Sequence, residues 1–262
     1  MSLERDRTRR RAVEIHDETA AWFASEYDTE NIFESPFRYG RHLIDRTWAQ
    51  CVSQLRAGAK CLDVGSGIGI HMTRLLEQGF QVSGIEPSRE MRRLAEKHVP
   101  ADLISDGSIL QLPATDSSFD FVYAIEVFRY LGTQDNERGH QEIARVLHPG
   151  GIYFGTYVNR WALDGFRQLS QVRGLVSRLT GAPLRYHVEF ETPSSLEAKL
   201  KQAGFSEVSL HGAMLAPLRI LYKLYPKFAA SVARRTMPHE TRLSDQPTIR
   251  PLAGHLMAIA RR

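Results

Sequence analysis

Hydrophobic positions change their spacing along the chain in a way that predicts helices first and a sheet afterwards. Residues 8–27 have a helical pattern rich in polar side chains. A clearer amphipathic helix follows, with apolar side chains at spacings of one, three and four residues from Leu43 to Leu55. Ala57 and Gly58 end it, so residues 1–57 are predicted to form a helical cap.

Short apolar runs alternate with helical patterns beyond residue 58. The predicted strands are residues 60–64, 80–85, 102–105, 119–125 and 152–158. This alternation predicts right-handed βαβ units and a doubly wound parallel sheet with helices on both faces. Ligands of such sheets bind at the carboxyl ends of the strands, near the point where the strand order reverses. Residues 58–158 are therefore the predicted ligand-binding core of a single α/β domain.

The last part, residues 159–262, contains predicted helices at 161–179 and 192–204 and predicted strands at 205–210 and 254–260. A long insert, residues 213–251, separates the two strands. Within it, residues 218–235 alternate apolar and basic side chains. Two interpretations stay open: weak contact with a membrane surface or a lipid-like acceptor, and a helix packed on the sheet edge with a solvated basic face.

Composition and charge are those of an ordinary globular protein. The 262 residues are 42% hydrophobic and 24% charged, and the formal net charge of +4 permits an anionic partner without requiring one. No apolar run approaches the roughly 18 residues that cross a bilayer, and the arginine-rich start lacks the apolar segment of a signal peptide. A cytoplasmic location is expected. The cysteines, Cys51 and Cys61, do not suggest a disulfide scaffold, and no metal ligands are assigned.

A glycine-rich turn follows the first strand and precedes a helix. Gly65 and Gly67 allow the backbone to turn sharply and approach a ligand closely, and the helix after Gly69 directs free N–H groups towards it. Glu86 ends the second strand, 21 positions after Gly65, where a carboxylate can accept hydrogen bonds from both hydroxyls of a ribose. The pair predicts an adenosine-containing cofactor.

Asp63 distinguishes the two cofactor classes that use this pair. It lies two residues before Gly65, where a carboxylate would repel the pyrophosphate of a dinucleotide. S-adenosylmethionine carries a sulfonium and an ammonium group and no phosphate, so Asp63 suits it. The sixth position counted from Gly65 is Ile70, where the dinucleotide fingerprint requires Gly or Ala. These residues favour the methyl donor.

Four strings resemble those of the class I S-adenosylmethionine-dependent methyltransferases, in particular the small-molecule branch similar to ubiquinone and menaquinone methyltransferases. The strings are Leu62-Asp-Val-Gly-Ser-Gly-Ile-Gly69, Gly84-Ile-Glu-Pro-Ser88, Leu112-Pro113 with Asp116-Ser-Ser-Phe-Asp120, and Arg145-Val-Leu-His-Pro-Gly-Gly151. They keep the family's order and spacing over residues 60–155. The resemblance implies a Rossmann-like sheet of seven strands whose last strand is antiparallel, and transfer of a methyl group from S-adenosylmethionine, with S-adenosylhomocysteine as product.

The resemblance also implies a role for each matching residue. The glycine loop would surround the methionine part of the donor, Glu86 would hold the ribose, and the following residues would flank the adenine. Two registers stay open for the adenine-contacting position, Asp106 or Ser108. The cofactor-binding residues expected are Asp63, Gly65, Ser66, Gly67, Gly69, His71, Glu86, Pro87, Ser88, Met91, Asp106, Gly107, Ser108, Ile109, Glu126 and Val127.

A catalytic base is the least determined part of the predicted site. Many family members have a histidine just after the fourth strand, but this chain has Phe128-Arg129-Tyr130 there. His187, which precedes the helix that starts at Thr192, is the candidate base, and His71 is the alternative. Nucleic acid is not an expected substrate, because the motif of base N-methyltransferases after the fourth strand is replaced by Glu126-Val-Phe-Arg129.

Competing functions remain open at this stage. An NAD(P)-dependent oxidoreductase would use a similar glycine turn, and a non-catalytic protein would bind S-adenosylmethionine on the same fold. The expected partner is a small-molecule or lipid-like acceptor. Its identity, the acceptor atom (O, N or C) and the oligomeric state stay undetermined by the residues alone.

Overall fold

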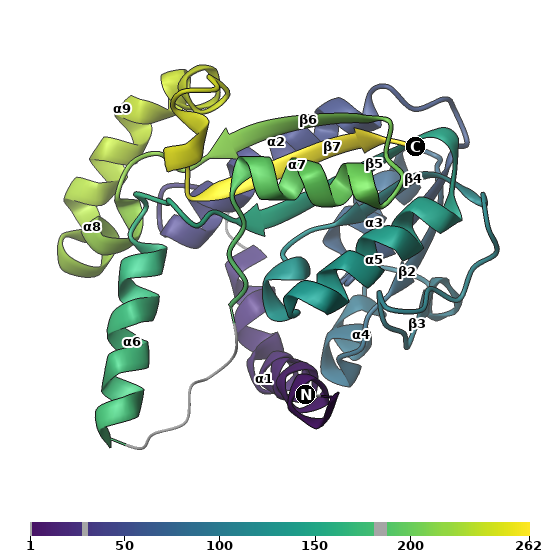
Figure 1. Cartoon of the computed structure of the whole chain (residues 1–262), viewed down its shortest axis with the longest axis horizontal. Helices are drawn as coiled ribbons and strands as arrows, with labels where there is room; N and C mark the ends of the chain where they lie inside the picture. The colour runs from purple at the N-terminus through teal and green to yellow at the C-terminus, as the bar shows by residue number, and fades with distance from the viewer. Residues whose placement is uncertain (1, 28–30, 181–187) are drawn as a thin grey trace.

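A seven-stranded sheet forms the centre of the molecule in the computed structural model, which describes residues 2–27, 31–180 and 188–262 (Figure 1). Its strand order is β3-β2-β1-β4-β5-β7-β6. Strands β1 to β5 run parallel, whereas β7 is antiparallel to both β5 and β6. The predicted fold class is therefore confirmed. The strands are β1 (Lys60–Val64), β2 (Gln81–Ile85), β3 (Ile104–Ser105), β4 (Phe119–Ala124), β5 (Leu147–Val158), β6 (Glu207–Ala213) and β7 (His255–Arg261).

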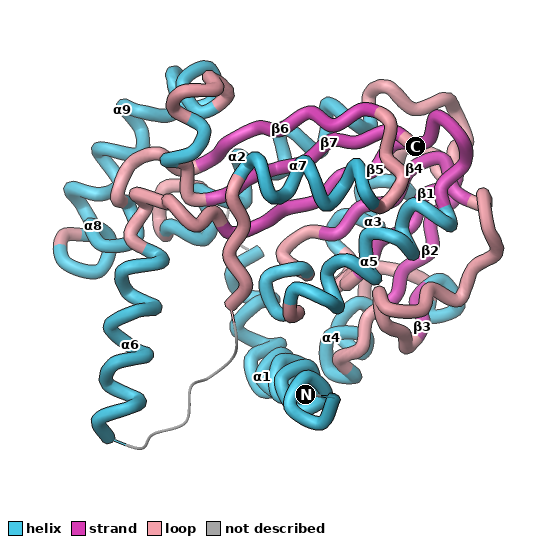
Figure 2. The backbone as a smooth tube through the Cα atoms, in the orientation of Figure 1, coloured by secondary structure: helices cyan, strands magenta, loops and turns pink. Residues whose placement is uncertain are grey.

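Helices cover both faces of this sheet and extend beyond the end at which β5 and β6 finish (Figures 1 and 2). Their first residues follow the sequence signals for helix starts: Ser35 and Thr192 cap α2 and α7, each followed by proline, and Ser88 caps α4. The helices are α1 (Ser2–Tyr27), α2 (Pro36–Val52), α3 (Ile70–Glu77), α4 (Arg89–Ala95), α5 (Thr133–Val146), α6 (Phe166–Thr180), α7 (Pro193–Gln202), α8 (Leu218–Leu224) and α9 (Pro226–Ser244), with short 3₁₀ turns η1 (Ala101–Leu103), η2 (Phe128–Tyr130) and η3 (Arg250–Leu252).

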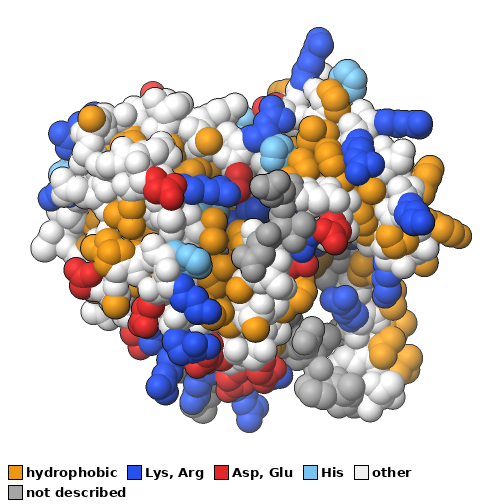
Figure 3. Space-filling model, turned by 180° about the vertical axis from the view of Figure 1, so that it is seen from behind, with side chains coloured by type: hydrophobic (Ala, Val, Ile, Leu, Met, Phe, Trp, Pro, Cys, Tyr) orange, Lys and Arg blue, Asp and Glu red, His pale blue; other side chains and the backbone are white. Residues whose placement is uncertain are grey.

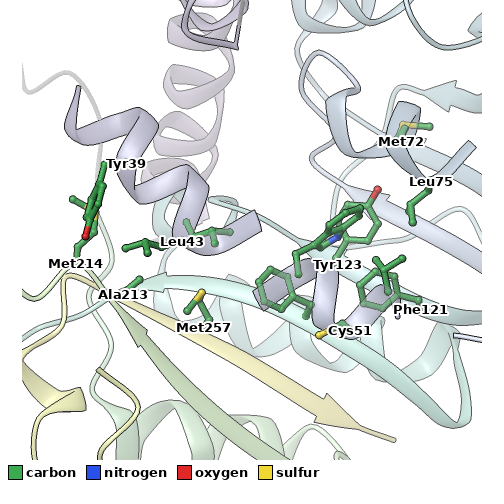
Figure 4. Packing of buried hydrophobic residues seen from close by; sticks show 14 of the residues in the cluster. Tyr39, Leu43, Cys51, Met72, Leu75, Phe121, Tyr123, Ala213, Met214 and Met257 are labelled. Atoms are coloured by element: carbon green, nitrogen blue, oxygen red, sulfur yellow. The ribbon is translucent and has the colours of Figure 1, made fainter. Parts of the chain in front are cut away.

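Strand alternation divides the apolar side chains between two cores. In β4, Phe121 and Tyr123 join the core under α2, α3, α8 and α9, whereas Val122 and Ala124 join the core under α5 and α7. Figure 4 shows the first core, where Cys51 of α2 and Leu75 of α3 lie over the sheet. Both cysteines are free and buried. Because α2 belongs to this core, only α1 of the predicted cap lies outside it, against α2, α4 and η2.

Several predicted boundaries differ from those of the structure. The third strand has two residues instead of four, because η1 occupies its first half. The helix predicted from residue 161 begins at Phe166, after Gly165 with φ +93°. The fifth strand begins earlier than residue 152, at Leu147. Strand β6 is shifted to Glu207–Ala213, so the insert begins after Ala213 and folds into α8, α9 and η3.

No helix in the described residues is long and apolar enough to cross a membrane. Helix α6 nevertheless carries a row of exposed apolar side chains, and it leaves the body of the molecule at the end that also carries α8 and α9 (Figure 2). These exposed helices start beside the cavity described next, because Phe166 of α6 and Arg219 of α8 both line it.

Candidate active site

A cavity of 1010 Å³ opens at the carboxyl ends of β1, β2 and β4. Ligands of parallel α/β sheets bind at this edge, where the strand order reverses between β1 and β4. One wall of the cavity comes from the turns that follow these strands. The other wall comes from α1, α2, η2, α6 and α8.

The turn after β1 needs glycine at its first position. Gly65 has φ +75°, and a Cβ atom there would lie 2.5 Å from Cγ2 of Val127. The backbone N–H groups of Gly65 and Ser66 both donate to the carbonyl oxygen of Ile85, at 2.8 and 3.0 Å. The loop is thus held between the ends of β2 and β4.

Glu86 connects this loop to the start of α4. Its carboxylate accepts hydrogen bonds from the backbone N–H of Gly67 and of Ser88, both at 2.8 Å. Burial raises the pKa of Glu86, and these two N–H donors act in the opposite direction. The carboxylate is therefore fixed at the cavity wall with lone pairs left for a further donor.

Asp63 is the second acid of this wall, at the end of β1. Its side chain is only 3% exposed, and burial, reinforced by the nearby Glu86 carboxylate, raises the pKa of Asp63 to about 8. Close to it, the buried Oγ atom of Ser66 has no hydrogen-bond partner in the described part of the chain. A buried polar atom without a partner is costly, so a ligand that bonds it stabilises the loop.

Arg41 of α2 brings a cation to the same cavity, and sequence reasoning missed it. Its guanidinium lies over the Tyr27 ring, 4.8 Å from the centroid. No carboxylate pairs with it within residues 2–27, 31–180 and 188–262. A helical spacing of apolar residues identified α2 as a core helix, and nothing in that pattern distinguished a cavity-facing arginine from a solvated one.

Glu126 ends β4 with a backbone conformation that non-glycine residues rarely adopt, φ +63°. Its carboxylate pairs with Arg129 and with His255 Nε2, the latter at 3.2 Å, and accepts a hydrogen bond from the Thr156 hydroxyl at 3.1 Å. Burial alone would raise the pKa of Glu126, but the adjacent His255 and Arg129 side chains hold it well below its usual value. Glu126 is therefore an ionised group already neutralised by its neighbours.

The structure brings most of the predicted cofactor residues together around the cavity. Gly69 and Ser88 lie just behind its wall, as the residues that precede α3 and α4. The residues that line the cavity are Asp63, Gly65, Ser66, Gly67, His71, Glu86, Pro87, Met91, Gly107, Ser108, Ile109, Glu126 and Val127.

Asp106, like Gly69 and Ser88, does not line the cavity. Its side chain is 75% exposed and pairs with Arg92 at 3.2 Å. Ser108, two residues later, lines the cavity instead. The geometry thus favours the second of the two registers. His187, the predicted base, lies outside the described residues, and His71 directs Nε2 to Asp45 at 2.9 Å.

Aromatic side chains form the wall opposite the glycine loop. They come from four separate parts of the chain, so no local sequence motif predicted them. The set consists of Trp22, Phe23, Tyr27, Phe37, Tyr130 and Phe166. Arg129 and Arg219 lie over the Phe166 ring, 4.6 and 4.9 Å from its centroid. This wall suits a flat or apolar ligand next to the acids of the first wall.

Comparisons with known proteins agree with this geometry. A family model described as a methyltransferase domain matches residues 62–155. An uncharacterized methyltransferase of Geobacillus kaustophilus is 32% identical over 149 residues, which cover 55% of this chain and 69% of that protein. The chain belongs to the class I S-adenosylmethionine-dependent methyltransferases.

Further comparisons of this methyltransferase also find methyltransferases. An uncharacterized methyltransferase of Mycobacterium tuberculosis is 31% identical over 140 residues, which cover 52% of this chain and 54% of that protein. Two solved structures share the fold over most of the chain. A Thermotoga maritima protein described as a possible histamine N-methyltransferase has a TM-score of 0.56 at 19% identity, covering 86% and 91% of the two chains. An Archaeoglobus fulgidus methyltransferase has a TM-score of 0.57 at 15% identity, covering 85% and 94%.

The residues of the methyltransferase fit its donor, S-adenosylmethionine. Glu86 offers a carboxylate at the cavity wall, Asp63 is a buried acid that a bound cation would hold in its ionised form, and Ser66 offers a buried hydroxyl without a partner among the described residues. A Cβ atom added to Gly67 would meet nothing within 4 Å, so the loop leaves open space above it. These observations explain why the wall suits a sulfonium ligand and not a dinucleotide.

Proposed function

We propose that this methyltransferase transfers the methyl group to a small, largely apolar acceptor bound against the aromatic wall. The observation that carries the proposal is the continuity of the cavity. Its 1010 Å³ lie at the upper end of the roughly 300–1,000 Å³ of single-ligand pockets, which suits two ligands side by side. The acidic wall and the aromatic wall belong to this one space.

The donor side of the proposal assigns one task to each polar group. Glu86 accepts hydrogen bonds from the ribose hydroxyls. Asp63 and Ser66 accept hydrogen bonds from the ammonium group of the methionine part, and Arg41 pairs with its carboxylate. S-adenosylmethionine, when bound, supplies an activated methyl group. Charge supports the assignment. Arg41 is a cation without a carboxylate partner among the described residues, so it can pair with the carboxylate of the donor. The pKa of Asp63 is raised to about 8, and a bound cation would lower it and favour the ionised carboxylate.

The chain's contribution to the reaction is alignment and exclusion of water. Methyl transfer is an in-line displacement, and holding the two reactants in line contributes several kcal/mol, up to about 7–11. Helix α1 supplies the cover: Asp17 accepts hydrogen bonds from the Ser88 hydroxyl at 2.5 Å and from the Glu90 N–H at 3.1 Å. These bonds dock α1 on α4, beside the proposed adenine site.

Calorimetric titration and an acceptor screen test this function. We expect binding of S-adenosylmethionine and S-adenosylhomocysteine and none of NADH. We also expect release of S-adenosylhomocysteine when flat, apolar acceptors such as naphthols and naphthylamines are added. Binding of NADH in preference to both would contradict the donor assignment. Tight donor binding without turnover of any acceptor would favour a non-catalytic cofactor-binding protein.

A membrane surface is the proposed source of the acceptor, and the exposed apolar residues of α6, α8 and α9 support this. On α6, Val172, Leu175, Val176 and Leu179 follow helical spacing on one face and are 50–77% exposed. At the α8–α9 junction, Leu224, Tyr225 and Phe228 are 59–65% exposed. Large exposed apolar patches mark interaction sites.

The basic residues of this region support contact with a negatively charged lipid surface. Residues 165–188 contain four arginines and residues 208–239 contain five lysines and arginines, and neither segment contains an acidic residue. The whole chain has an excess of only four basic residues, so the remainder of the chain is net acidic. Figure 3 shows basic and hydrophobic side chains next to each other at the end of the molecule that carries α8 and α9. This combination is typical of interfacial helices.

Vesicle co-sedimentation at low salt tests the membrane contact. We expect binding to phosphatidylserine-containing vesicles and none to neutral phosphatidylcholine vesicles. Lys223→Glu with Lys227→Glu should abolish binding, because both side chains are exposed next to the apolar tip. The control, Arg89→Glu with Lys97→Glu, reverses two exposed charges on and after α4 and should bind like the wild type. Equal sedimentation of both variants, or of both vesicle types, would contradict the contact.

A further inference from the structure

We propose that His16 of α1 is the general base that takes a proton from the acceptor, and hence that the acceptor atom is the oxygen of an ionisable hydroxyl group. The inference rests on the proposed function, because it places the acceptor in the cavity against the aromatic wall. The tautomer of His16, its position and the hydrogen bonds of the other histidines support this role.

A hydrogen bond fixes the tautomer of His16. Its Nδ1 lies 2.6 Å from the carbonyl oxygen of Ala12, one helical turn earlier. A carbonyl oxygen only accepts, so Nδ1 carries the hydrogen. The neutral ring therefore has its lone pair on Nε2, as a base requires. His16 lines the cavity, and among the described residues Nε2 has no hydrogen-bond partner.

Aromatic contacts hold the ring in place. The His16 ring stacks on Phe23, with centroids 5.6 Å apart and planes at 11°, and meets the edge of Tyr130 at 4.8 Å and 87°. Stacking and the bond to Ala12 restrict both side-chain torsions, so the direction of Nε2 is defined before an acceptor binds.

One short segment, residues 127–130, connects the donor loop with His16. Tyr130 belongs to η2, which starts directly after Val127, and Val127 is the residue that packs against Gly65 of the donor loop. The segment of residues 127–130 thus contacts the donor loop at its first residue and His16 at its last. An acceptor between the two walls would contact both.

Charges around His16 keep the ring neutral. Burial lowers the pKa of His16, and Arg129 on η2 lowers it further, whereas Asp17 on α1 and the bond to Ala12 act in the opposite direction. The neutral form is the one that accepts a proton, so the base is ready at pH 7.

In the other two cavity histidines that the structure describes, Nε2 bonds to a carboxylate. A carboxylate only accepts, so the lone pair of the neutral ring lies on Nδ1, which in His255 is buried without a hydrogen-bond partner among the described residues. His71 directs Nε2 to Asp45 at 2.9 Å and packs against Trp48. His255 directs Nε2 to Glu126 at 3.2 Å. Of the cavity-lining histidines that the structure describes, His16 is the one whose Nε2 meets no protein group.

The proposed step balances in atoms and charge. The acceptor oxygen forms a bond to the methyl carbon as the bond from that carbon to sulfur breaks, and the electron pair of that bond stays on sulfur. The hydroxyl proton moves to Nε2 of His16. The positive charge of the sulfonium is thereby replaced by the positive charge of the imidazolium, which then releases its proton to solvent.

Two substitutions separate base catalysis from packing. His16→Asn keeps an amide N–H that reaches the Ala12 carbonyl but has no atom in place of Nε2. Phe23→Leu is the matched control, because it removes the stacking partner and leaves Nε2 intact. Both are compared with the wild type for turnover of a naphthol and a naphthylamine, for donor affinity and for the dependence of kcat on pH.

We expect His16→Asn to lower kcat for the naphthol by about 100-fold or more. The KM for the naphthol and the affinity for the donor should each change by less than about three-fold. The wild-type kcat should level off with rising pH once His16 is neutral, below the ordinary histidine value of about 6.5. In the variant, kcat should instead rise about ten-fold per pH unit, because only ionised naphthol reacts. Phe23→Leu should raise KM, because Phe23 belongs to the acceptor wall, but should keep the plateau of kcat with pH, because Nε2 is still present.

Three outcomes would overturn the inference. The first is an unchanged kcat and plateau in His16→Asn, and the second is an equal loss in Phe23→Leu with the same profile. The third is a wild type that methylates the naphthylamine and not the naphthol. A wild type that binds the donor and methylates neither compound contradicts the proposed acceptor itself, and a wild type that binds no donor contradicts the donor assignment.

Discussion

The two walls of the cavity are built in different ways. The donor wall consists of residues 63–127, each placed by the end of a strand or the start of the helix that follows it. The acceptor wall takes side chains from α1, α2, η2, α6 and α8, which are far apart along the chain. The first wall is therefore encoded locally and the second by tertiary packing. This difference explains why a motif identifies the donor and no motif identifies the acceptor.

A side chain at Gly65 should break the donor wall with the largest effect. Gly65→Ala places a Cβ atom 2.5 Å from Val127 and strains a backbone with φ +75°. We expect donor affinity to fall about 100-fold, or ~2.7 kcal/mol, measured by calorimetry. Gly67→Ala is the control: its Cβ would meet nothing within 4 Å, so the loss should be smaller despite φ +55°. Equal losses would contradict the close contact with Val127.

Removing either acid should weaken the donor by a smaller amount. Glu86→Ala and Asp63→Ala each delete a buried acidic side chain of the cavity wall. Each should reduce affinity for S-adenosylmethionine ten-fold or more, on the order of 1.4 kcal/mol. Unchanged affinity in both variants would exclude the proposed position of the donor.

The raised pKa of Asp63, about 8, predicts two opposite responses to pH. The folded protein keeps a proton on Asp63 up to that value, whereas the unfolded chain loses it near ~3.9. Folding stability is therefore lost as pH rises between these values, and Asp63→Asn should unfold at a higher temperature than the wild type at pH 8. Donor cations favour the ionised carboxylate, so wild-type affinity should rise from pH 6 to pH 8.5 and proton release should accompany binding. A flat wild-type profile would contradict this.

Changes in the acceptor wall should have the smallest effect on the donor. Phe166→Ala removes the ring that lies under Arg129 and Arg219. We expect KM for a naphthol to rise about five-fold, corresponding to ~1 kcal/mol, with donor affinity unchanged. A parallel loss of donor affinity would show that the two walls are not independent.

Residue patterns predicted the donor half of the molecule closely. Lys60–Val64 was predicted with its observed bounds, and Asp63 and Glu86 were placed at the cavity. These predictions worked because a parallel strand buried on both faces, followed by glycines, has few alternative structures. The register after β3 was left open between Asp106 and Ser108, because a two-residue strand offers too little pattern to align.

The acceptor half required the tertiary structure. Sequence reasoning treated α1 as a polar helix and did not single out His16, whose function depends on Phe23, Tyr130 and Ala12 around it. The amphipathic pattern of α2 likewise did not indicate that Arg41 faces the cavity. The predicted base, His187, falls outside the described residues and stays a prediction.

Residue patterns alone specify the strand–turn–helix units, the acidic groups at their ends and hence the class of methyl donor. Those features depend on residues a few positions apart, whose conformations are set by local sterics and by burial in a parallel sheet. Which side chains face the donor across the cavity is set by tertiary packing. That choice depends on how helices separated by up to about two hundred positions pack together, and hydrophobic periodicity records which face of a helix is buried without recording its partner.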